Sequence, residues 1–163
     1  MRRLLTIVSI TAVVIIGLLI MGVLLSDTTA QPVQKVYTPE QLLKEANKLR
    51  AEKSVAPLKL DPRLNQSAQW KADDMVKTGV NHISSDGARG NTKINVFTND
   101  SCQWYGENLQ MGDFESPFTY DGGWPTSKGH YESLIRPRFD LTGFGIKVDG
   151  DKVYYVQHFC DLK

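Results

Sequence analysis

An apolar run near the N-terminus constrains this chain more than any other feature of its sequence. Leu4–Leu25 is 22 residues long and carries no charge, with two Thr and one Ser as its clearly polar residues. About 20 helical residues are enough to cross a hydrocarbon core of roughly 30 Å. Arg2 and Arg3 precede the run, and positive residues tend to stay on the cytoplasmic side. The sequence therefore predicts a transmembrane signal anchor over residues 1–25, with the remaining chain outside the cytoplasm.

The alternative for this segment is a signal peptide that is removed. Signal peptides have apolar regions of about 7–15 residues, which is shorter than this run. Thr28, Thr29 and Ala30 nevertheless offer small residues for cleavage before Gln31. The predicted location is thus the cell membrane, with a single pass and an extracytoplasmic C-terminal domain, or the exterior if cleavage occurs. Residues 26–37 are polar and predict a linker between the anchor and the domain.

The balance of charge excludes one class of partner. Of the 19 Lys and Arg residues, Arg2 and Arg3 precede the apolar run, so residues 26–163 hold 17 of them against 18 Asp and Glu. Nucleic-acid binders show clustered basic residues, and a near-neutral domain without such clusters argues against that function. A content of 41% hydrophobic and 23% charged residues is typical of a globular protein. We expect one folded domain over residues 38–163.

Both cysteines, Cys102 and Cys160, lie in the exported part of the chain. An oxidising compartment favours a disulfide between them, and two buried free thiols are the alternative. A loop of this length would stabilise the fold by about 4 kcal/mol in the chain-entropy model.

Two helices are expected early in the domain. Thr38 can cap a helix that has Pro39 in its first turn and ends near Ser54, and Gln41 can complete a capping box. A second helix should begin at Asp61-Pro62 and end at Gly79, with apolar residues at helical spacing between them.

The rest of the chain predicts loops and strands. Residues 82–95 are rich in Ser, Asp, Gly and Asn and predict a loop, with a short strand at about 94–97. A further strand is expected at about 103–111, and a hairpin should join 142–148 to 152–160 through a turn at 149–151. Helices first and strands late, without regular alternation, indicate an α+β domain.

Three polar clusters stand out along this pattern: Asn81-His82, then Gly106-Glu107-Asn108-Leu109, then the segment 127–131 that contains His130. Each is weak evidence alone, because the short catalytic signatures HExxH and GxSxG and a Gly-rich phosphate loop are all missing from the sequence. His158 lies in the last predicted strand, and we expect it to be a half-exposed strand residue rather than a ligand.

The ordered set of motifs resembles a known family. The segments are NKLR, PLKLDPRLNQSAQWKADDM, NHISSDG, YGENL, WPTSKGHYESLI and GFGIKVDGDKVYYVQHF, in that order. This order resembles the CAP superfamily of cysteine-rich secretory, insect-venom-antigen and plant pathogenesis-related proteins, in a compact bacterial form. The resemblance implies a three-layer α-β-α sandwich with a central antiparallel sheet.

The resemblance also implies a site. By this resemblance, His82, Glu107 and His130 are candidate catalytic residues that lie together in a central cleft. Tyr131 either lines the cleft or packs in the core. Two imidazoles and one carboxylate can hold Zn²⁺ or another divalent metal and leave a position open for water. Many relatives carry a second Glu between the Trp and the His, and residues 125–129 here contain no acid. We therefore predict a trio and not a tetrad.

Three functions are compatible with this site. The first is a binding module that holds a lipid, a glycan or a protein of the cell envelope or the exterior. The second is a metal-assisted or His/Glu acid–base hydrolase acting on peptide or envelope material. The third is a scaffold whose polar trio has no ligand. Because no clear nucleophile accompanies the trio, we favour binding over catalysis.

Overall fold

The computed structural model describes residues 36–113 and 115–162. In chain order its elements are α2 (Pro39–Glu52), β1 (Lys59–Leu60), α3 (Pro62–Thr78), α4 (Gly90–Thr98), β2 (Cys102–Gly112), the 3₁₀ helix η1 (Trp124–Thr126), α5 (Lys128–Leu134), β3 (Leu141–Asp149) and β4 (Lys152–Leu162). The α+β class is confirmed.

The two early helices begin where their capping residues predict. The Thr38 hydroxyl accepts a hydrogen bond from the Gln41 amide, and the Gln41 side chain accepts one from the Thr38 amide. The Asp61 carboxylate accepts from the Arg63 amide at 2.8 Å, at the start of α3. Each cap satisfies amides that have no partner inside the helix, which fixes the first turn.

The sheet is mixed and not purely antiparallel. Its strand order is β1-β3-β4-β2, with β3 and β4 forming the expected hairpin and β2 antiparallel to β4. The short strand β1 runs parallel to β3, which corrects the expectation of an antiparallel sheet. Residues 59–60 lead directly into α3, so β1 has only two residues to pair. Strand β2 lies at the opposite edge of the sheet.

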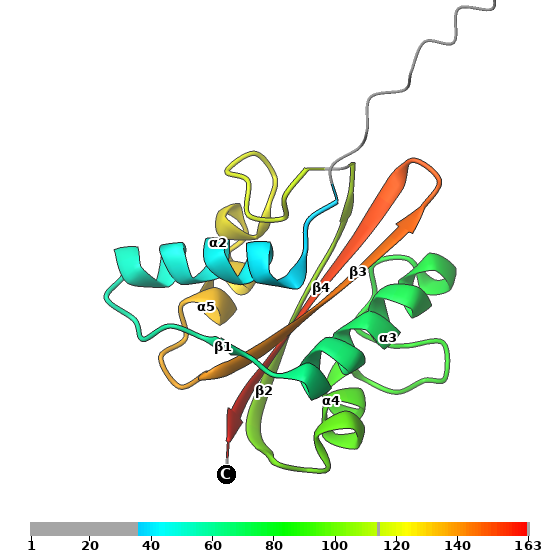
Figure 1. Cartoon of the computed structure of the whole chain (residues 1–163). Helices are drawn as coiled ribbons and strands as arrows, with labels where there is room; N and C mark the ends of the chain where they lie inside the picture. The colour runs from blue at the N-terminus through cyan, green and yellow to red at the C-terminus, as the bar shows by residue number, and fades with distance from the viewer. Residues whose placement is uncertain (1–35, 114, 163) are drawn as a thin grey trace, which may run out of the picture. The chain divides into compact units, whose positions relative to one another are not determined.

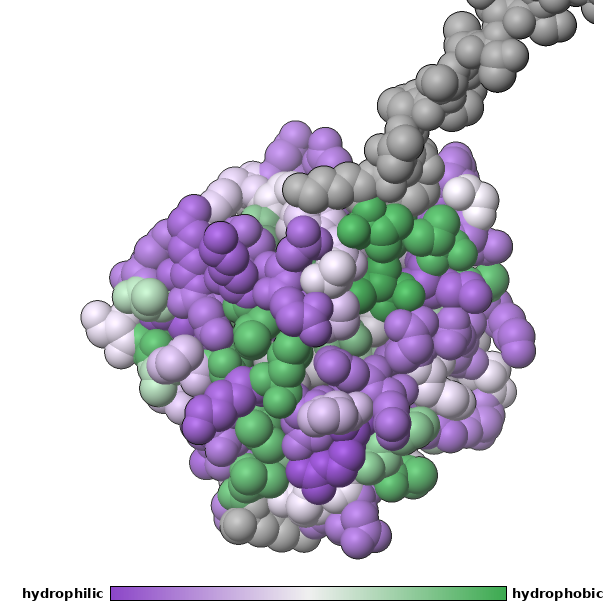
Figure 2. Space-filling view, in the orientation of Figure 1, coloured by the Kyte–Doolittle hydropathy of each residue, from purple (hydrophilic) through white to green (hydrophobic). Residues whose placement is uncertain are grey.

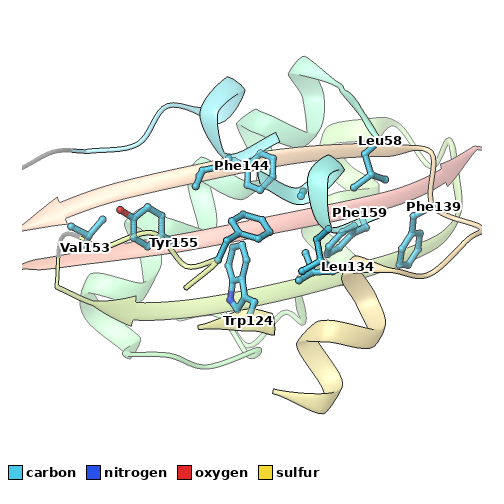
Figure 3. Packing of buried hydrophobic residues seen from close by; sticks show 12 residues of the cluster. Leu58, Trp124, Leu134, Phe139, Phe144, Val153, Tyr155 and Phe159 are labelled. Atoms are coloured by element: carbon cyan, nitrogen blue, oxygen red, sulfur yellow. The ribbon is translucent and has the colours of Figure 1, made fainter. Parts of the chain in front are cut away.

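Helices cover both faces of the sheet, so that the chain forms three layers (Figure 1). Alternate side chains of β4 point into opposite layers. Val153, Tyr155 and Phe159 join a cluster with α2, η1 and α5, where Trp124 is fully buried (Figure 3). Val156 and Cys160 face α3 and α4 on the other side. The outer surface seen in Figure 2 is mostly hydrophilic, with apolar residues in small groups.

Helix α4 differs from the sequence prediction. Residues 82–95 were expected to be a loop and 94–97 a strand, whereas Gly90–Thr98 is a helix. Its buried residues, Gly90, Ile94 and Thr98, are spaced by four and lie on one helical face. Tertiary packing of this face against α3 and β2 outweighs the low helix propensity of Gly, Asn and Thr.

The predicted disulfide is confirmed. Cys102 and Cys160 are joined, with their Cα atoms 5.4 Å apart. The bond ties the first residue of the edge strand β2 to the central strand β4.

The predicted transmembrane segment at residues 1–25, and most of the predicted linker, lie outside the described residues. Within residues 36–113 and 115–162, no helix is both long enough and apolar enough to cross a membrane.

Candidate functional site

Glu107 is the centre of the polar cluster. It lies in β2 directly opposite His158 of β4, and both side chains point toward the layer of α3 and α4. Its carboxylate is only 7% exposed. The Oε2 atom lies 2.9 Å from Nε2 of His158, and the Oε1 atom lies 2.7 Å from Nδ1 of His82. Two imidazoles therefore hold the two oxygens of one buried carboxylate.

His158 is fully buried, which corrects the expectation of a half-exposed strand residue. Its Nδ1 lies 2.7 Å from the hydroxyl of Ser67, a buried residue of α3. Since an ionised carboxylate only accepts hydrogen bonds, Nε2 of His158 carries a proton. Two protonation states fit the remaining contact: the Ser67 hydroxyl donates to a neutral ring, or it accepts from a charged ring while donating to the Leu64 carbonyl.

His82 occupies the opposite, open end of this chain of contacts. Its side chain is 59% exposed, and Nδ1 is the ring atom that faces Glu107. Within the described part of the chain, no hydrogen bond occupies its Nε2. Because the carboxylate holds one nitrogen of the ring, His82 presents the other nitrogen to solvent in a fixed orientation.

The loop that carries His82 is held by α3. Lys71 donates to the hydroxyl of Ser84 at 3.3 Å, and the Asp74 carboxylate accepts from the amide of Ser85 at 3.1 Å. Lys71 is fully buried. Its ammonium lies 3.6 Å from Asp74, so the two charges compensate one another. This ion pair fixes the backbone immediately after His82.

Gly90 leaves space for the carboxylate. A Cβ atom built on Gly90 would lie 2.3 Å from Oε2 of Glu107, far inside contact distance. Helix α4 begins at Gly90, so the carboxylate lies against its first turn, where the helix dipole favours negative charge. The absence of a side chain at position 90 is thus a requirement of the site.

Opposing effects act on the ionisation of Glu107. Burial alone would raise the pKa of its carboxyl, but hydrogen bonds from His158 and His82, together with the charges of both rings, lower that pKa from 4.5 to about 2. Glu107 is therefore a carboxylate throughout the physiological range.

This pKa predicts a stability change in acid. A carboxyl whose pKa falls on folding adds stability above its unfolded value of 4.5, and this contribution is lost as pH falls toward 2. The shift corresponds to at most about 3 kcal/mol. Urea unfolding of the native protein and of Glu107→Gln should therefore differ most at pH 5–7, and the difference should shrink below pH 4.5. A difference that stays constant from pH 7 to pH 2 would contradict the assigned pairing.

His130, the third member of the predicted trio, is placed differently. It lies in α5, and its backbone carbonyl accepts a hydrogen bond from the buried Asn108 side chain at 3.2 Å. Burial, followed by the positive charge of His82, lowers the pKa of the His130 ring. Among the described residues, no hydrogen bond joins that ring to His82 or Glu107. The structure thus brings two of the three residues into direct contact.

The described residues do not support the metal prediction. Within residues 36–113 and 115–162, no group of three or more His, Cys, Asp or Glu side chains could hold a metal ion. Both oxygens of Glu107 are engaged by imidazoles, and both ring nitrogens of His158 have partners. Among the described residues, Glu107 and His158 thus have their polar atoms occupied, and Nε2 of His82 is the imidazole nitrogen of this group that faces solvent.

Tyr131, a candidate lining residue, is half-buried and packs against the cluster of α2, η1 and α5. Trp124 in the same layer donates from its indole nitrogen to the Leu109 carbonyl. Trp124 is thus part of the core, and Tyr131 packs at its edge.

A cleft of about 300 Å³ opens beside His82 and Glu107. Arg89, Asn91 and Tyr105 complete its polar walls. Ile94, Gly90 and Gly106 also line it. A cleft of this size accommodates a small ligand or one unit of a larger one.

Comparison with known proteins agrees with this architecture. The model of the CAP, or cysteine-rich secretory protein, family matches residues 43–159. The chain therefore belongs to the CAP family.

Solved structures show the same fold at low identity. An extracellular protein containing an SCP domain from Bacillus anthracis is 22% identical with a TM-score of 0.63, over 75% of this chain and 39% of that one. An outer surface protein from Borrelia burgdorferi is 22% identical with a TM-score of 0.67, over 76% of this chain and 92% of that one. A cysteine-rich secretory protein from Staphylococcus aureus is 20% identical with a TM-score of 0.55, over 78% of this chain and 40% of that one. No curated protein sequence matches significantly.

Proposed function

We propose that this chain is an extracytoplasmic CAP domain that binds a ligand of the cell envelope or the exterior through the cleft beside His82 and Glu107. The membership of the CAP family and the disulfide support an oxidising location. The apolar run Leu4–Leu25 supports an anchor in the cell membrane.

One observation carries the binding proposal. His82 is exposed at the mouth of the cleft, while Glu107, His158 and Ser67 hold it from behind through contacts of 2.7, 2.9 and 2.7 Å. Burying a carboxylate and a histidine is costly unless they are paired, and apolar residues of similar volume often give a fold equal or greater stability. Stability alone therefore gives little reason for this arrangement. A ring that is supported from the interior and open to solvent is well suited to contact a ligand.

The test uses a panel of soluble glycans, short peptides and lipid micelles, observed through the amide resonances of the ¹⁵N-labelled protein. A ligand should shift resonances of the cleft segments 82–91 and 105–107. His82→Ala should weaken its binding by about tenfold, as expected for one charge-assisted hydrogen bond. Lys44→Ala, on the exposed face of α2 in the other layer, is the matched control. Binding that is unchanged by His82→Ala would overturn the proposal.

The hydrolase remains a second candidate because the contact between Glu107 and His82 resembles the carboxylate–histidine pair of a general base. Ser67 is fully buried and cannot attack a substrate, so the base would have to activate water. Peptide and envelope material should then show mass changes that Glu107→Gln abolishes. If no panel member changes, this candidate is rejected.

A further inference from the structure

A cation lines the cleft beside His82. Arg89 is exposed on its wall, and within the described residues it forms no ion pair. Glu107 is the acid that lines the cleft, and its two oxygens are occupied by imidazoles. The nearby Asp86 pairs with Lys93. An unpaired guanidinium beside an exposed imidazole favours an anionic group on the ligand, and its planar fork matches the geometry of a carboxylate.

An aromatic ring also lines the cleft. Tyr105 of β2 is 42% exposed, and its hydroxyl accepts a hydrogen bond of 2.9 Å from the amide nitrogen of Asn91. This bond limits the movement of the ring. The amide oxygen of Asn91 has no hydrogen-bond partner in the part of the chain that the structure describes. The lining of the cleft therefore combines an aromatic ring with a neighbouring acceptor for a hydroxyl or an amide N–H.

These features fit a sugar ring. The C–H face of a pyranose packs on an aromatic ring while its hydroxyls bind polar neighbours.

We propose that this cleft binds a saccharide unit that carries a carboxylate, with the sugar ring on Tyr105 and the carboxylate between Arg89 and His82. The proposal rests on the proposed function, because it names the ligand class of the same cleft.

A matched pair of probes tests this assignment. N-acetylmuramic acid and N-acetylglucosamine differ only in a lactyl ether that bears a carboxylate. Titration of the ¹⁵N-labelled full chain should show at least about tenfold tighter binding of the acidic sugar, because a hydrogen bond between charged groups is stronger than one between neutral groups. Arg89→Gln should reduce this preference to about twofold or less, while Arg89→Lys should retain part of it. Tyr105→Leu should weaken both sugars equally, and Lys44→Gln should change neither.

The outcomes separate this proposal from the function on which it rests. Equal affinity for the two sugars, or no shift of cleft resonances at the highest soluble concentration of either, overturns the acidic-sugar assignment. N-acetylglucosamine 6-phosphate binding more tightly than N-acetylmuramic acid would replace the carboxylate by a phosphate and also overturn it. If a peptide or a lipid binds the cleft in a His82-dependent manner while both sugars fail, the proposed function stands and the sugar assignment falls. If no probe shifts the cleft, both fall.

Discussion

Replacing His158 by leucine is expected to lower the free energy of unfolding by about 3–5 kcal/mol at pH 7, because it removes one partner of a buried pair. Glu107 would keep its contact with His82 but lose the donor to Oε2, in a position where its side chain is only 7% exposed. The pKa of Glu107 should rise accordingly. Urea unfolding monitored by fluorescence measures the loss.

The double variant His158→Leu/Glu107→Leu is the control for this prediction. Removing both partners of a buried pair is far less costly than removing one, so the double variant should recover most of the lost stability. If His158→Leu unfolds at the same urea concentration as the native protein, His158 does not support Glu107. If the double variant is less stable than His158→Leu, the loss comes from packing and not from the unpaired carboxylate.

Gly145→Ala is expected to destabilise the protein by about 3 kcal/mol, as a severe case of overpacking. A Cβ atom at position 145 would lie 2.1 Å from the backbone oxygen of Ala68 in α3. A flexible side chain could relieve such a clash by changing its rotamer, but the backbone of α3 cannot. Helix α3 would therefore have to move away from β3. Since Ser67 lies beside Ala68, the contact between Ser67 and His158 should lengthen as well.

Gly129→Ala is the matched control for the glycine prediction. Gly129 lies in α5, a Cβ atom at this position would have nothing within 4 Å, and alanine is the better helix former. The same chemical change should therefore leave the stability unchanged or raise it slightly. Thermal unfolding measures the stability of both variants. If both lose the same stability, the close contact of α3 with β3 is not the reason that Gly145→Ala is destabilising.

Local signals in the sequence were enough to predict the elements that end in recognisable caps and turns. Thr38 and Asp61 mark the starts of α2 and α3, and Asp149-Gly150-Asp151 marks the turn between β3 and β4. Helix α4 was missed because its residues favour turns and because its stability comes from packing Ile94 and Thr98 against distant elements. Such non-local contacts leave little trace in local composition.

The site could be predicted in part only. His82 and Glu107 were expected to meet, and they do. The role of His158 depends on the register of β2 against β4, which no local pattern provides. A disulfide between directly opposite cysteines would have placed Glu107 against Tyr155. In the structure Cys102 pairs with Leu162 and Cys160 with Tyr105, and the one-residue irregularity between Cys102 and Trp104 places Glu107 opposite His158 and not opposite Gln157. His130 was expected in the same group, but its backbone carbonyl and not its ring makes the observed contact with β2.

The central claim is that two imidazoles hold one buried carboxylate, and the tautomers of those rings test it most directly. Long-range ¹H–¹⁵N spectra of the native protein should show a proton on Nε2 of His158 that exchanges slowly with water. They should also show a proton on Nδ1 of His82, the nitrogen that donates a hydrogen bond to Glu107. Both signatures should change in Glu107→Gln. A His158 ring that exchanges as freely as a surface histidine, with a spectrum unaffected by Glu107→Gln, would contradict the account.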